Sequence, residues 1–242
     1  MATIIMTKKG IVLLSGGLDS SVTAFIANQE GYELSALSFL YGQQHDREIQ
    51  AAKKIAHSLS ITDHIFFTID LSQFGGSTLL KSSDQSISTP KHVSDIGKEI
   101  PNTYVPARNT IFLSIALAFA ETRDAEAIFT GVTAMDYSGY PDCRPEYIKA
   151  FQNLADLATK KTVSGSAIVI KTPLINFNKA DIVKKGKNLS VPFEHTWSCY
   201  NGRKKACGKC ESCLLRLQGF QQAQITDPLS YESLPEWYHQ TK

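Results

Sequence analysis

Short apolar runs alternate with segments of helical periodicity along most of this chain. Strands are expected at residues 11–14, 34–39, 65–69, 127–130 and 167–170, and helices at residues 20–29, 44–59, 109–122 and 179–187. Such alternation is typical of right-handed β-α-β units around a parallel sheet. The pattern therefore predicts an α/β fold with an open, doubly wound, mostly parallel sheet that binds its ligands at the carboxyl ends of the strands.

The length of the chain limits its organisation. A chain of 242 residues is long enough for one α/β domain with a small appendage. We expect the α/β domain at residues 1–190 and a smaller, helical C-terminal region at residues 191–242. Residues 75–100 are rich in Ser, Thr, Lys and Asp and lack periodicity, so they are expected to form a long loop that is either a lid or disordered.

A turn rich in glycine and serine lies directly between the first expected strand and the first expected helix. Residues 11–21 read I-V-L-L-S-G-G-L-D-S-S. Gly16 and Gly17 leave room for several backbone amides to converge on an anion, and the helix that begins near Asp19 adds its positive N-terminal end. Hydroxyl donors come from three serines, Ser15, Ser20 and Ser21. The turn therefore predicts a phosphate-binding site.

Two common nucleotide-binding motifs are absent from the sequence. It contains neither G-x-x-x-x-G-K-[ST] nor G-x-G-x-x-G, so neither the Walker loop nor the dinucleotide fingerprint applies. The alternative interpretation of the turn is an ordinary glycine-rich connection capped by Asp or Ser. The full S-G-G-x-D-S-S string after an apolar strand favours the phosphate site.

Four of the five cysteines lie in one C-terminal segment, S-C-Y-N-G-R-K-K-A-C-G-K-C-E-S-C. Their C-x7-C-x2-C-x2-C spacing matches a closed tetrahedral zinc site of structural type. The expected ligands are Cys199, Cys207, Cys210 and Cys213. An iron–sulfur cluster and redox-active or simply buried thiols are the alternatives. Cys143 stands apart, and an inert, half-buried thiol is favoured over a nucleophile there.

Polar residues also lie where other expected helices begin. The string Y-V-P-A-R-N puts Arg108 and Asn109 at the positive end of an apolar helix, where the arginine could hold a phosphate or carboxylate. A capping Asn beside a solvated Arg is the alternative. His45 could shuttle a proton or face solvent, and Lys179 could reach a phosphate or lie on the surface.

The segment at residues 131–145, G-V-T-A-M-D-Y-S-G-Y-P-D-C-R-P, follows an expected strand. Its rings, carboxylates and hydroxyl suit a pocket for a flat, hydrogen-bonding heterocycle. The candidates are Asp136, Tyr137, Tyr140 and Asp142. A plain turn-rich loop is the alternative.

Charge and hydropathy exclude some partners. The net charge is +2, and basic residues gather only around residues 184–187 and 203–205, so we expect no binding to nucleic acid. The N-terminus has no signal pattern, and the longest apolar stretch, residues 111–120, is about half of a membrane span, so we expect no membrane association. Clustered cysteines of metal-site type fit a reducing, cytoplasmic compartment.

Taken together, these strings resemble the motifs of one family. The loop at residues 15–21 is similar to the pyrophosphate-binding loop of the N-type ATP pyrophosphatases, the PP-loop superfamily. Six strings resemble, in order, those of the 7-cyano-7-deazaguanine synthases of queuosine biosynthesis: S-G-G-x-D-S, Y-G-Q-x-H-x-x-E, V-P-A-R-N, D-Y-S-G-Y-P-D-C-R, T-P-L-I…K-A-D-I and S-C-Y…C-G-K-C-E-S-C-x-L-R. The departures, Leu14 for Phe, Leu18 for Gln and Ala107 for Gly, remove no polar group with an expected role.

The resemblance implies an ATP-dependent carbon–nitrogen ligase that forms 7-cyano-7-deazaguanine from 7-carboxy-7-deazaguanine and ammonia through adenylated intermediates, with two ATP cleaved to two AMP and two pyrophosphates. It also implies magnesium at the phosphates, one structural zinc per chain and a homodimer. The expected catalytic residues are Asp19, Arg108 and Lys179. The expected ATP-binding residues are Leu14, Ser15, Gly16, Gly17, Leu18, Asp19, Ser20, Ser21, Val22, Thr23 and Ala24. The expected substrate-binding residues are His45, Asn109, Asp136, Tyr137, Tyr140 and Asp142.

Two other functions compete with this interpretation. A tRNA-modifying enzyme of the thiolase or lysidine synthetase type shares the loop, but it normally adds a basic RNA-binding module and, for sulfur transfer, metal-free catalytic cysteines. This chain offers neither. A non-enzymatic zinc-binding interaction module leaves the phosphate loop unexplained.

Overall fold

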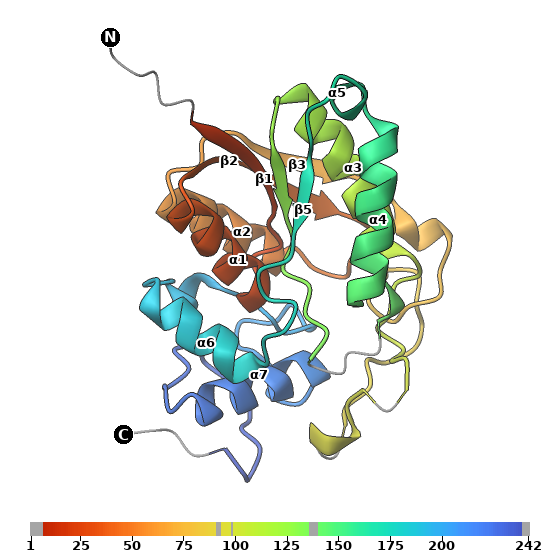
Figure 1. Ribbon diagram of the computed structural model, residues 1–242. Coiled ribbons are helices and arrows are strands. Elements are labelled where there is room, and N and C mark those ends of the chain that lie inside the picture. Colours follow the sequence, from red (N-terminus) through yellow and green to blue (C-terminus); the bar gives the residue numbers. More distant parts are fainter. Residues whose placement is uncertain (1–6, 91–92, 98, 136–139, 239–242) are drawn as a thin grey trace.

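The computed structural model describes residues 7–90, 93–97, 99–135 and 140–238. A five-stranded sheet lies in the upper half of Figure 1, and all of its neighbouring strands are parallel. The strand order is β3-β2-β1-β4-β5. The strands are β1 (Lys8–Leu13), β2 (Tyr32–Leu40), β3 (His64–Thr68), β4 (Ala127–Phe129) and β5 (Val169–Lys171). The expected parallel α/β sheet is confirmed.

Seven α-helices accompany the sheet in the described part of the chain. They are α1 (Leu18–Gln29), α2 (Arg47–Ser58), α3 (Arg108–Thr122), α4 (Pro145–Ala158), α5 (Lys160–Val163), α6 (Lys179–Asn188) and α7 (Glu211–Gln222). Short 3-10 turns lie at Leu71–Gln73, Val93–Asp95, Pro141–Cys143 and Phe193–His195. The sequence pattern predicted no helix at α4 or α5, whereas α7 lies in the C-terminal region that was expected to be helical. In α4 the signal was present, because the buried Ile148, Phe151 and Ala155 have helical spacing.

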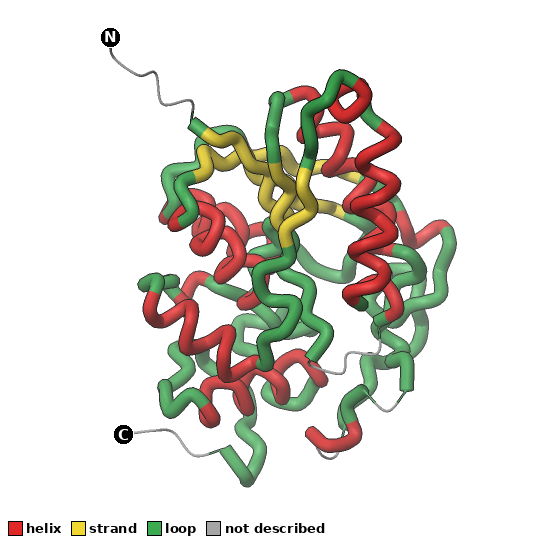
Figure 2. The backbone as a smooth tube through the Cα atoms, viewed as in Figure 1, coloured by secondary structure: helices red, strands yellow, loops and turns green. Residues whose placement is uncertain are grey.

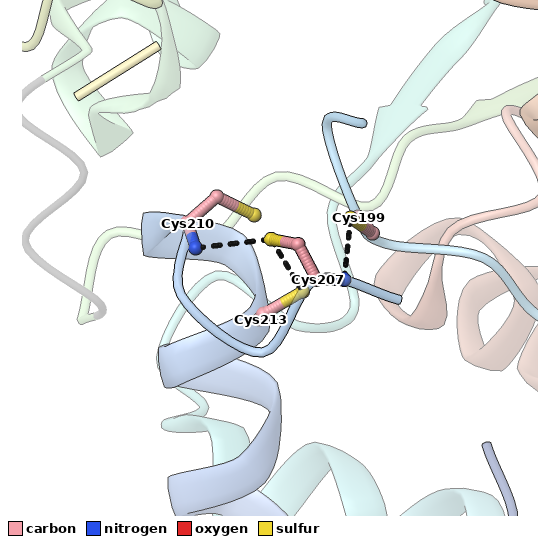
Figure 3. A group of neighbouring side chains, drawn as sticks. All are labelled: Cys199, Cys207, Cys210 and Cys213. Carbon is pink, nitrogen blue, oxygen red and sulfur yellow. Dashed lines mark hydrogen bonds between the residues drawn. The ribbon is translucent and has the colours of Figure 1, made fainter. Parts of the chain in front are cut away.

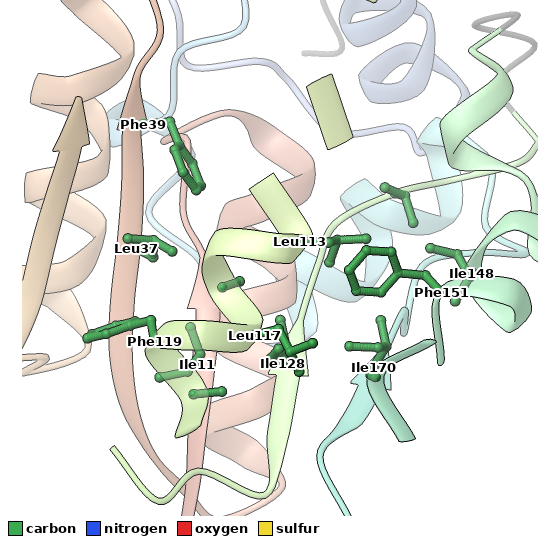
Figure 4. Close-up of a cluster of buried hydrophobic side chains, with 14 of the residues drawn as sticks. Ile11, Leu37, Phe39, Leu113, Leu117, Phe119, Ile128, Ile148, Phe151 and Ile170 are labelled. Atoms are coloured by element: carbon green, nitrogen blue, oxygen red, sulfur yellow. The ribbon is translucent and has the colours of Figure 1, made fainter. Parts of the chain in front are cut away.

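Helices cover both faces of the sheet, which makes it doubly wound. Ile11 of β1 and Ile128 of β4 pack with α3 and α4 on one face (Figure 4). The next residue on each strand, Val12 and Phe129, packs with α1 and α2 on the other face. Because strands buried on both faces lack an alternating pattern, β1 and β4 appear in the sequence as continuous apolar runs.

Helix α6 and the C-terminal region with α7 lie below the carboxyl ends of the strands, where they are drawn in cyan and blue (Figure 1). A single apolar cluster joins Val22 of α1, Ile182 of α6 and Phe220 of α7. The ring of Phe220 also packs edge to face against that of Phe193, with ring centroids 5.1 Å apart. The α/β layer and the C-terminal region therefore share part of their core, and the division at residue 190 stays a prediction.

The segment at residues 75–100 has little regular structure in Figure 2, as expected for its described residues. Its first part is nevertheless packed: Leu80 is fully buried and bridges to Gln43, and the Thr78 amide donates to Asn102 O at 2.9 Å. These contacts tie the loop to the end of β2. The role as a lid stays a prediction.

A search of the described helices for a membrane span found none of sufficient length and apolar character.

Replacing the fully buried Ile128 by alanine should lower the free energy of unfolding by about 2–5 kcal/mol, because it leaves a cavity between the sheet and α3. Val169 of β5 is 43% exposed, so Val169→Ala should cost less than about 1 kcal/mol. Urea unfolding of both variants measures this difference. Equal losses would contradict the assignment of Ile128 to the core.

Candidate active site

A cavity of about 310 Å³ opens at the carboxyl ends of β1 and β4, where the strand order reverses. Open α/β sheets bind their ligands at this point. The lining comes from the loop after β1, residues 130–133 after β4, the first turns of α2, α3 and α6, and residues 197–216. A volume of this size is sufficient for a small-molecule ligand.

Residues 15–21 form a tight loop and the first turn of α1, and five of them line this cavity: Ser15, Gly17, Leu18, Asp19 and Ser20. Gly17 precedes the helix in an extended conformation, and no side chain of the described residues caps it. The serines instead bond within the loop: Ser15 Oγ lies 3.0 Å from Ser20 Oγ, and Ser21 Oγ donates to Gly17 O at 2.7 Å. The first-turn amides are therefore free of side-chain partners, which is the arrangement that binds anions at helix N-termini.

Two glycines allow the loop to pack closely against its neighbours. Gly16 has φ +81°, and a Cβ there would lie 2.4 Å from backbone atoms of both Glu48 and Ala52 in α2. A Cβ on Gly131, after β4, would lie 2.9 Å from the Ser20 amide nitrogen. Both contacts are shorter than any side chain tolerates, so glycine is required at each position.

Asp19 and Lys179 form an ion pair at the edge of the loop. Lys179 Nζ lies 2.8 Å from Asp19 Oδ2, and the two side chains are 14% and 27% exposed. The second carboxylate oxygen, Asp19 Oδ1, is buried and has no hydrogen-bond partner among the described residues. It is available to a cation or a donor from a bound ligand. The expected proximity of Asp19 and Lys179 to the phosphate loop is thus present in the geometry.

Arg108, at the first position of α3, lines the same cavity as this pair. Its guanidinium stacks over the Tyr41 ring, 5.8 Å from the centroid. Glu48 of α2 lines the same cavity, and burial raises its pKa to about 7 although the positive charge of Arg108 opposes this shift. Burial likewise raises the pKa of Tyr41 to about 12. The cavity therefore holds a cation beside a carboxylate that is partly protonated at neutral pH.

The N-terminus of α3 is held by the segment before α4. The Asn109 amide donates to Asp142 Oδ2 at 3.0 Å, and Asn109 Nδ2 donates to Asp142 O and to Cys143 Sγ, each at 3.2 Å. Tyr140 lines the cavity, and its hydroxyl lies 3.1 Å from Thr103 Oγ1. Burial raises the pKa of the Cys143 thiol to about 11, which disfavours a nucleophilic thiolate.

The residues expected to bind the substrate do not all line one cavity. Asn109 and Tyr140 line the large cavity, whereas Asp142 is 5% exposed, is absent from the lining and serves as an acceptor for α3. His45 lines a separate cavity of about 20 Å³. Its Nε2 donates to Tyr200 O at 2.9 Å, and burial lowers its pKa. Asp136 and Tyr137 lie outside the described residues.

Several residues that line the cavity had no role predicted from the sequence: Tyr41, Glu48, Trp197, Tyr200 and Arg216. For Glu48 a signal was available. It precedes the buried Ala52 and Ile55 by four and seven positions, so a helical pattern turns its side chain toward the core. An acid on the apolar face of a helix is rare and marks a functional candidate.

Arg216 of α7 is one of the largest fully buried side chains among the described residues. It forms two hydrogen bonds to Asp227, at 2.7 and 2.9 Å, and donates to Thr196 Oγ1 at 2.7 Å and to Phe193 O at 3.3 Å. Each guanidinium nitrogen of Arg216 therefore has a hydrogen-bond partner, as a buried charge requires. The pair joins α7 to the segment before the cysteine cluster.

The four expected cysteines gather into one buried group. Their sulfur atoms all lie within 4.8 Å of one another (Figure 3). Cys207 Sγ and Cys213 Sγ are 3.9 Å apart, close to the spacing of about 3.8 Å that zinc–sulfur bonds of 2.3 Å imply in a tetrahedron. Backbone amides donate to two of the sulfurs at 3.3–3.4 Å, as is common around metal thiolates. The donor set and its size fit zinc.

The cysteine group is connected to the phosphate loop through Trp197. The Trp197 amide donates to Gly16 O at 2.8 Å, and the indole Nε1 of Trp197 donates to Cys199 O at 2.9 Å. Arg47 of α2 stacks on the same indole ring, 5.3 Å from its centroid. One residue, Trp197, therefore links the loop, α2 and the cysteine group.

Comparisons with known proteins show the family to which this chain is similar. A family model described as "Queuosine biosynthesis protein QueC" matches residues 9–224. The chain is 51% identical over 231 residues to the 7-cyano-7-deazaguanine synthase of Citrifermentans bemidjiense, covering 95% of this chain and all of that protein. It is 54% identical over 219 residues to the 7-cyano-7-deazaguanine synthase of Microcystis aeruginosa, covering 90% and 93% of the two chains.

Solved structures give weaker likenesses. NMN synthetase from Francisella tularensis aligns with TM-score 0.42 and 21% identity over 77% of this chain and 63% of that one. A 4-thiouridine synthetase, solved with RNA and ATP, aligns with TM-score 0.43 and 18% identity over 89% of this chain and 50% of that one.

Proposed function

The chain belongs to the QueC family of queuosine biosynthesis proteins, and we propose that it is an ATP-dependent ligase that makes 7-cyano-7-deazaguanine from 7-carboxy-7-deazaguanine and ammonia. The observation that carries this proposal is the phosphate loop at residues 15–21, with free first-turn amides beside the Asp19–Lys179 pair in a ligand-sized cavity. Both the loop and the cavity lie where an open α/β sheet binds nucleotides.

The chemistry requires activation of a poor electrophile. A first ATP transfers AMP to a carboxylate oxygen and releases pyrophosphate, and ammonia then displaces AMP to give the amide. A second ATP adenylates the amide oxygen, and loss of AMP with two protons leaves the nitrile. No covalent bond to the protein is needed, so the protein positions the reactants and stabilises charge.

Residues 14–24 are the ATP-binding residues in this proposal: Leu14, Ser15, Gly16, Gly17, Leu18, Asp19, Ser20, Ser21, Val22, Thr23 and Ala24. The loop amides and hydroxyls hold the pyrophosphate part of ATP. Lys179 and Arg108 both line the cavity and offset the negative charge that develops at the phosphate attached to the substrate. Asp19 Oδ1, buried and without a described partner, is the group suited to a magnesium ion at the phosphates.

The deazapurine belongs beside the rings of the cavity. Phe39, Tyr41 and Phe112 line the cavity, and the rings of Phe39 and Phe112 are stacked with centroids 3.8 Å apart. Asn109 and Tyr140 supply polar contacts from the same wall. Asp142 acts through Asn109 by holding the N-terminus of α3, in place of the direct contact with the base that the sequence suggested.

The cysteine group holds one structural zinc per chain in this proposal. All four cysteines are buried, and four thiolates leave zinc no open position for catalysis. When bound, the metal would crosslink residues 199–213 and thereby keep Trp197 in place against Gly16.

Two further parts of the proposal concern assembly and location. Leu157 and Val163, on α4 and α5, are 82% and 79% exposed, and Leu154 is one helical turn from Leu157. Neighbouring exposed apolar side chains of this kind support self-association, and we propose a homodimer through this face. The four unpaired cysteines of the cluster support a reducing, cytoplasmic compartment.

With 7-carboxy-7-deazaguanine and ammonium present, ATP should be cleaved to AMP and pyrophosphate, because the loop lacks the lysine that supports γ-phosphoryl transfer. Chromatography of the nucleotides and mass spectrometry of the base follow the reaction, with two AMP formed per nitrile. Accumulation of ADP and orthophosphate would refute the adenylation chemistry. Omission of the base is the control.

Asp19→Asn should retain the fold and lose about 100-fold or more of its turnover, since the variant removes one negative charge at the phosphate loop. Asp84 is exposed, so Asp84→Asn is the matched control and should keep full activity. Steady-state rates and thermal melting curves are compared. A fully active Asp19→Asn enzyme would exclude a catalytic role for this carboxylate.

Cys213→Ser should lose its zinc and much of its soluble yield, because three thiolates and a weaker ligand bind the metal poorly. Cys143 lies outside the cluster, so Cys143→Ser should keep about one zinc per chain. Elemental analysis of both purified variants tests this. Iron and visible absorbance in the parent protein would contradict the zinc assignment and indicate an iron–sulfur cluster.

A further inference from the structure

A second, small cavity of about 20 Å³ adjoins the large one. The two share four lining residues: Tyr41, Glu48, Leu79 and Tyr200. A volume of about 10–15 Å³ already holds one water molecule. The small cavity therefore fits one molecule of the size of water or ammonia, next to the reaction site.

The polar lining of the small cavity includes hydrogen-bond acceptors from His45 and Glu48. His45 Nε2 faces a carbonyl oxygen, Tyr200 O, at 2.9 Å and must carry the proton of the neutral ring. His45 Nδ1 is then an acceptor, and it is buried without a hydrogen-bond partner among the described residues. Gln44 Nε2 donates to Thr78 O at 2.8 Å, and the amide oxygen is the acceptor of that side chain.

Glu48 is the negatively charged group of this lining. Its carboxylate forms no hydrogen bond or ion pair with the residues that the structure describes, although Arg108 is near enough to influence its charge. A cluster of acceptors around an unpaired carboxylate matches a small cation that only donates hydrogen bonds. Ammonium is such a cation, and the proposed reaction consumes its conjugate base.

We propose that the small cavity binds ammonium and that Glu48 accepts the proton whose loss turns ammonium into the nucleophile. This inference rests on the proposed function, because it assigns the site of one of that reaction's substrates. Glu48 is a catalytic residue in this proposal, and His45 is a ligand of the ammonium.

The proton balance of the step is complete. The Glu48 carboxylate takes one proton from NH4+ and becomes a carboxylic acid. The lone pair of NH3 forms a bond to the acyl carbon of the adenylate, the bond from that carbon to the AMP oxygen breaks, and AMP leaves with the electron pair. The attached nitrogen releases its surplus proton to solvent, and so does Glu48. Ammonium and the acyl adenylate thus become the amide, AMP and two protons.

The surroundings suit Glu48 to this task. Burial raises its pKa to about 7, which places proton uptake and release near neutral pH. The other charged or titratable groups that line the two cavities are Asp19, Tyr41, His45, Arg108, Tyr140, Cys143, Lys179, Tyr200 and Arg216. Asp19 is paired with Lys179, and His45 donates to a carbonyl, so Glu48 is the carboxylate left for ammonium.

Glu48→Gln keeps the shape of the side chain and removes its charge and basicity. Pyrophosphate exchange into ATP, measured with the carboxylate substrate and without ammonium, should stay within about threefold of the parent. Nitrile formation at subsaturating ammonium should fall about 100-fold, a typical effect of losing a general base. Glu33 is exposed on β2, and Glu33→Gln is the control that should change neither rate.

Nucleophile and pH give independent readouts. Hydroxylamine is largely unprotonated at neutral pH, so hydroxamate formation by Glu48→Gln should match the parent. In the parent, kcat/KM for total ammonium should rise with pH and level off above about pH 7, where Glu48 has lost its proton. In Glu48→Gln it should keep rising toward the pKa of ammonium, as the concentration of free ammonia grows. Glu48→Asp should recover part of the parent rate.

The outcomes are distinguishable. Loss of pyrophosphate exchange in a folded Glu48→Gln variant would place Glu48 in ATP or substrate binding and overturn the inference. An unchanged KM for ammonium, or equal losses with ammonium and hydroxylamine, would overturn it as well. A parent enzyme that forms no amide or nitrile from ammonia would instead refute the proposed function. If Glu48→Gln does not fold, the pH profile of the parent and the partial activity of Glu48→Asp decide the question.

Discussion

The geometry of the site depends on how tightly the backbone at Gly16 is enclosed. On one side it touches the backbone of α2, where any Cβ would lie 2.4 Å from Glu48 O, and on the other its carbonyl accepts the Trp197 amide at 2.8 Å. These contacts fix the phosphate loop relative to two segments that are distant in sequence. Because these segments pack tightly, a shift of the loop would displace both Glu48 of α2 and the cysteine group.

Charge is distributed unevenly around the enclosed loop. Asp19 and Lys179 are within hydrogen-bond distance and form an ion pair beside the phosphate loop. Glu48 and Arg108 are near each other without forming an ion pair, and burial therefore dominates the pKa of Glu48. The same cavity is thus lined by an ion pair beside the phosphate loop and by a second carboxylate, Glu48, whose pKa is raised by burial.

The sequence predicted those features that depend on short-range patterns. The apolar runs located β1 and β2, and the S-G-G-x-D-S-S string located the turn into α1, because each depends on neighbouring residues. The start of α2 was predicted at residue 44 and lies at Arg47, since Gln43 bridges to Leu80 and its side chain accepts from the Tyr41 amide. No local pattern reports such a contact.

The site was predicted in part for the same reason. The cysteine spacing brought four sulfurs together as expected, because ligands close in sequence report on a local fold. The partner of Asp142 was not predictable, since the pairing of its carboxylate with the first turn of α3 depends on how two distant segments pack. Trp197 and Arg216 were missed because their contacts, with Gly16 and Asp227, leave no periodic signature.

The lining by Trp197, Tyr200 and Arg216 has a consequence for the order in which the protein becomes competent. A ribosome synthesises the chain from the N-terminus, so the phosphate loop leaves the ribosome long before these residues do. Until the last part of the chain has been made, the loop lacks one of its walls. A nascent or truncated chain is therefore left with a solvent-open loop, in which a reactive adenylate would meet water before it met ammonia.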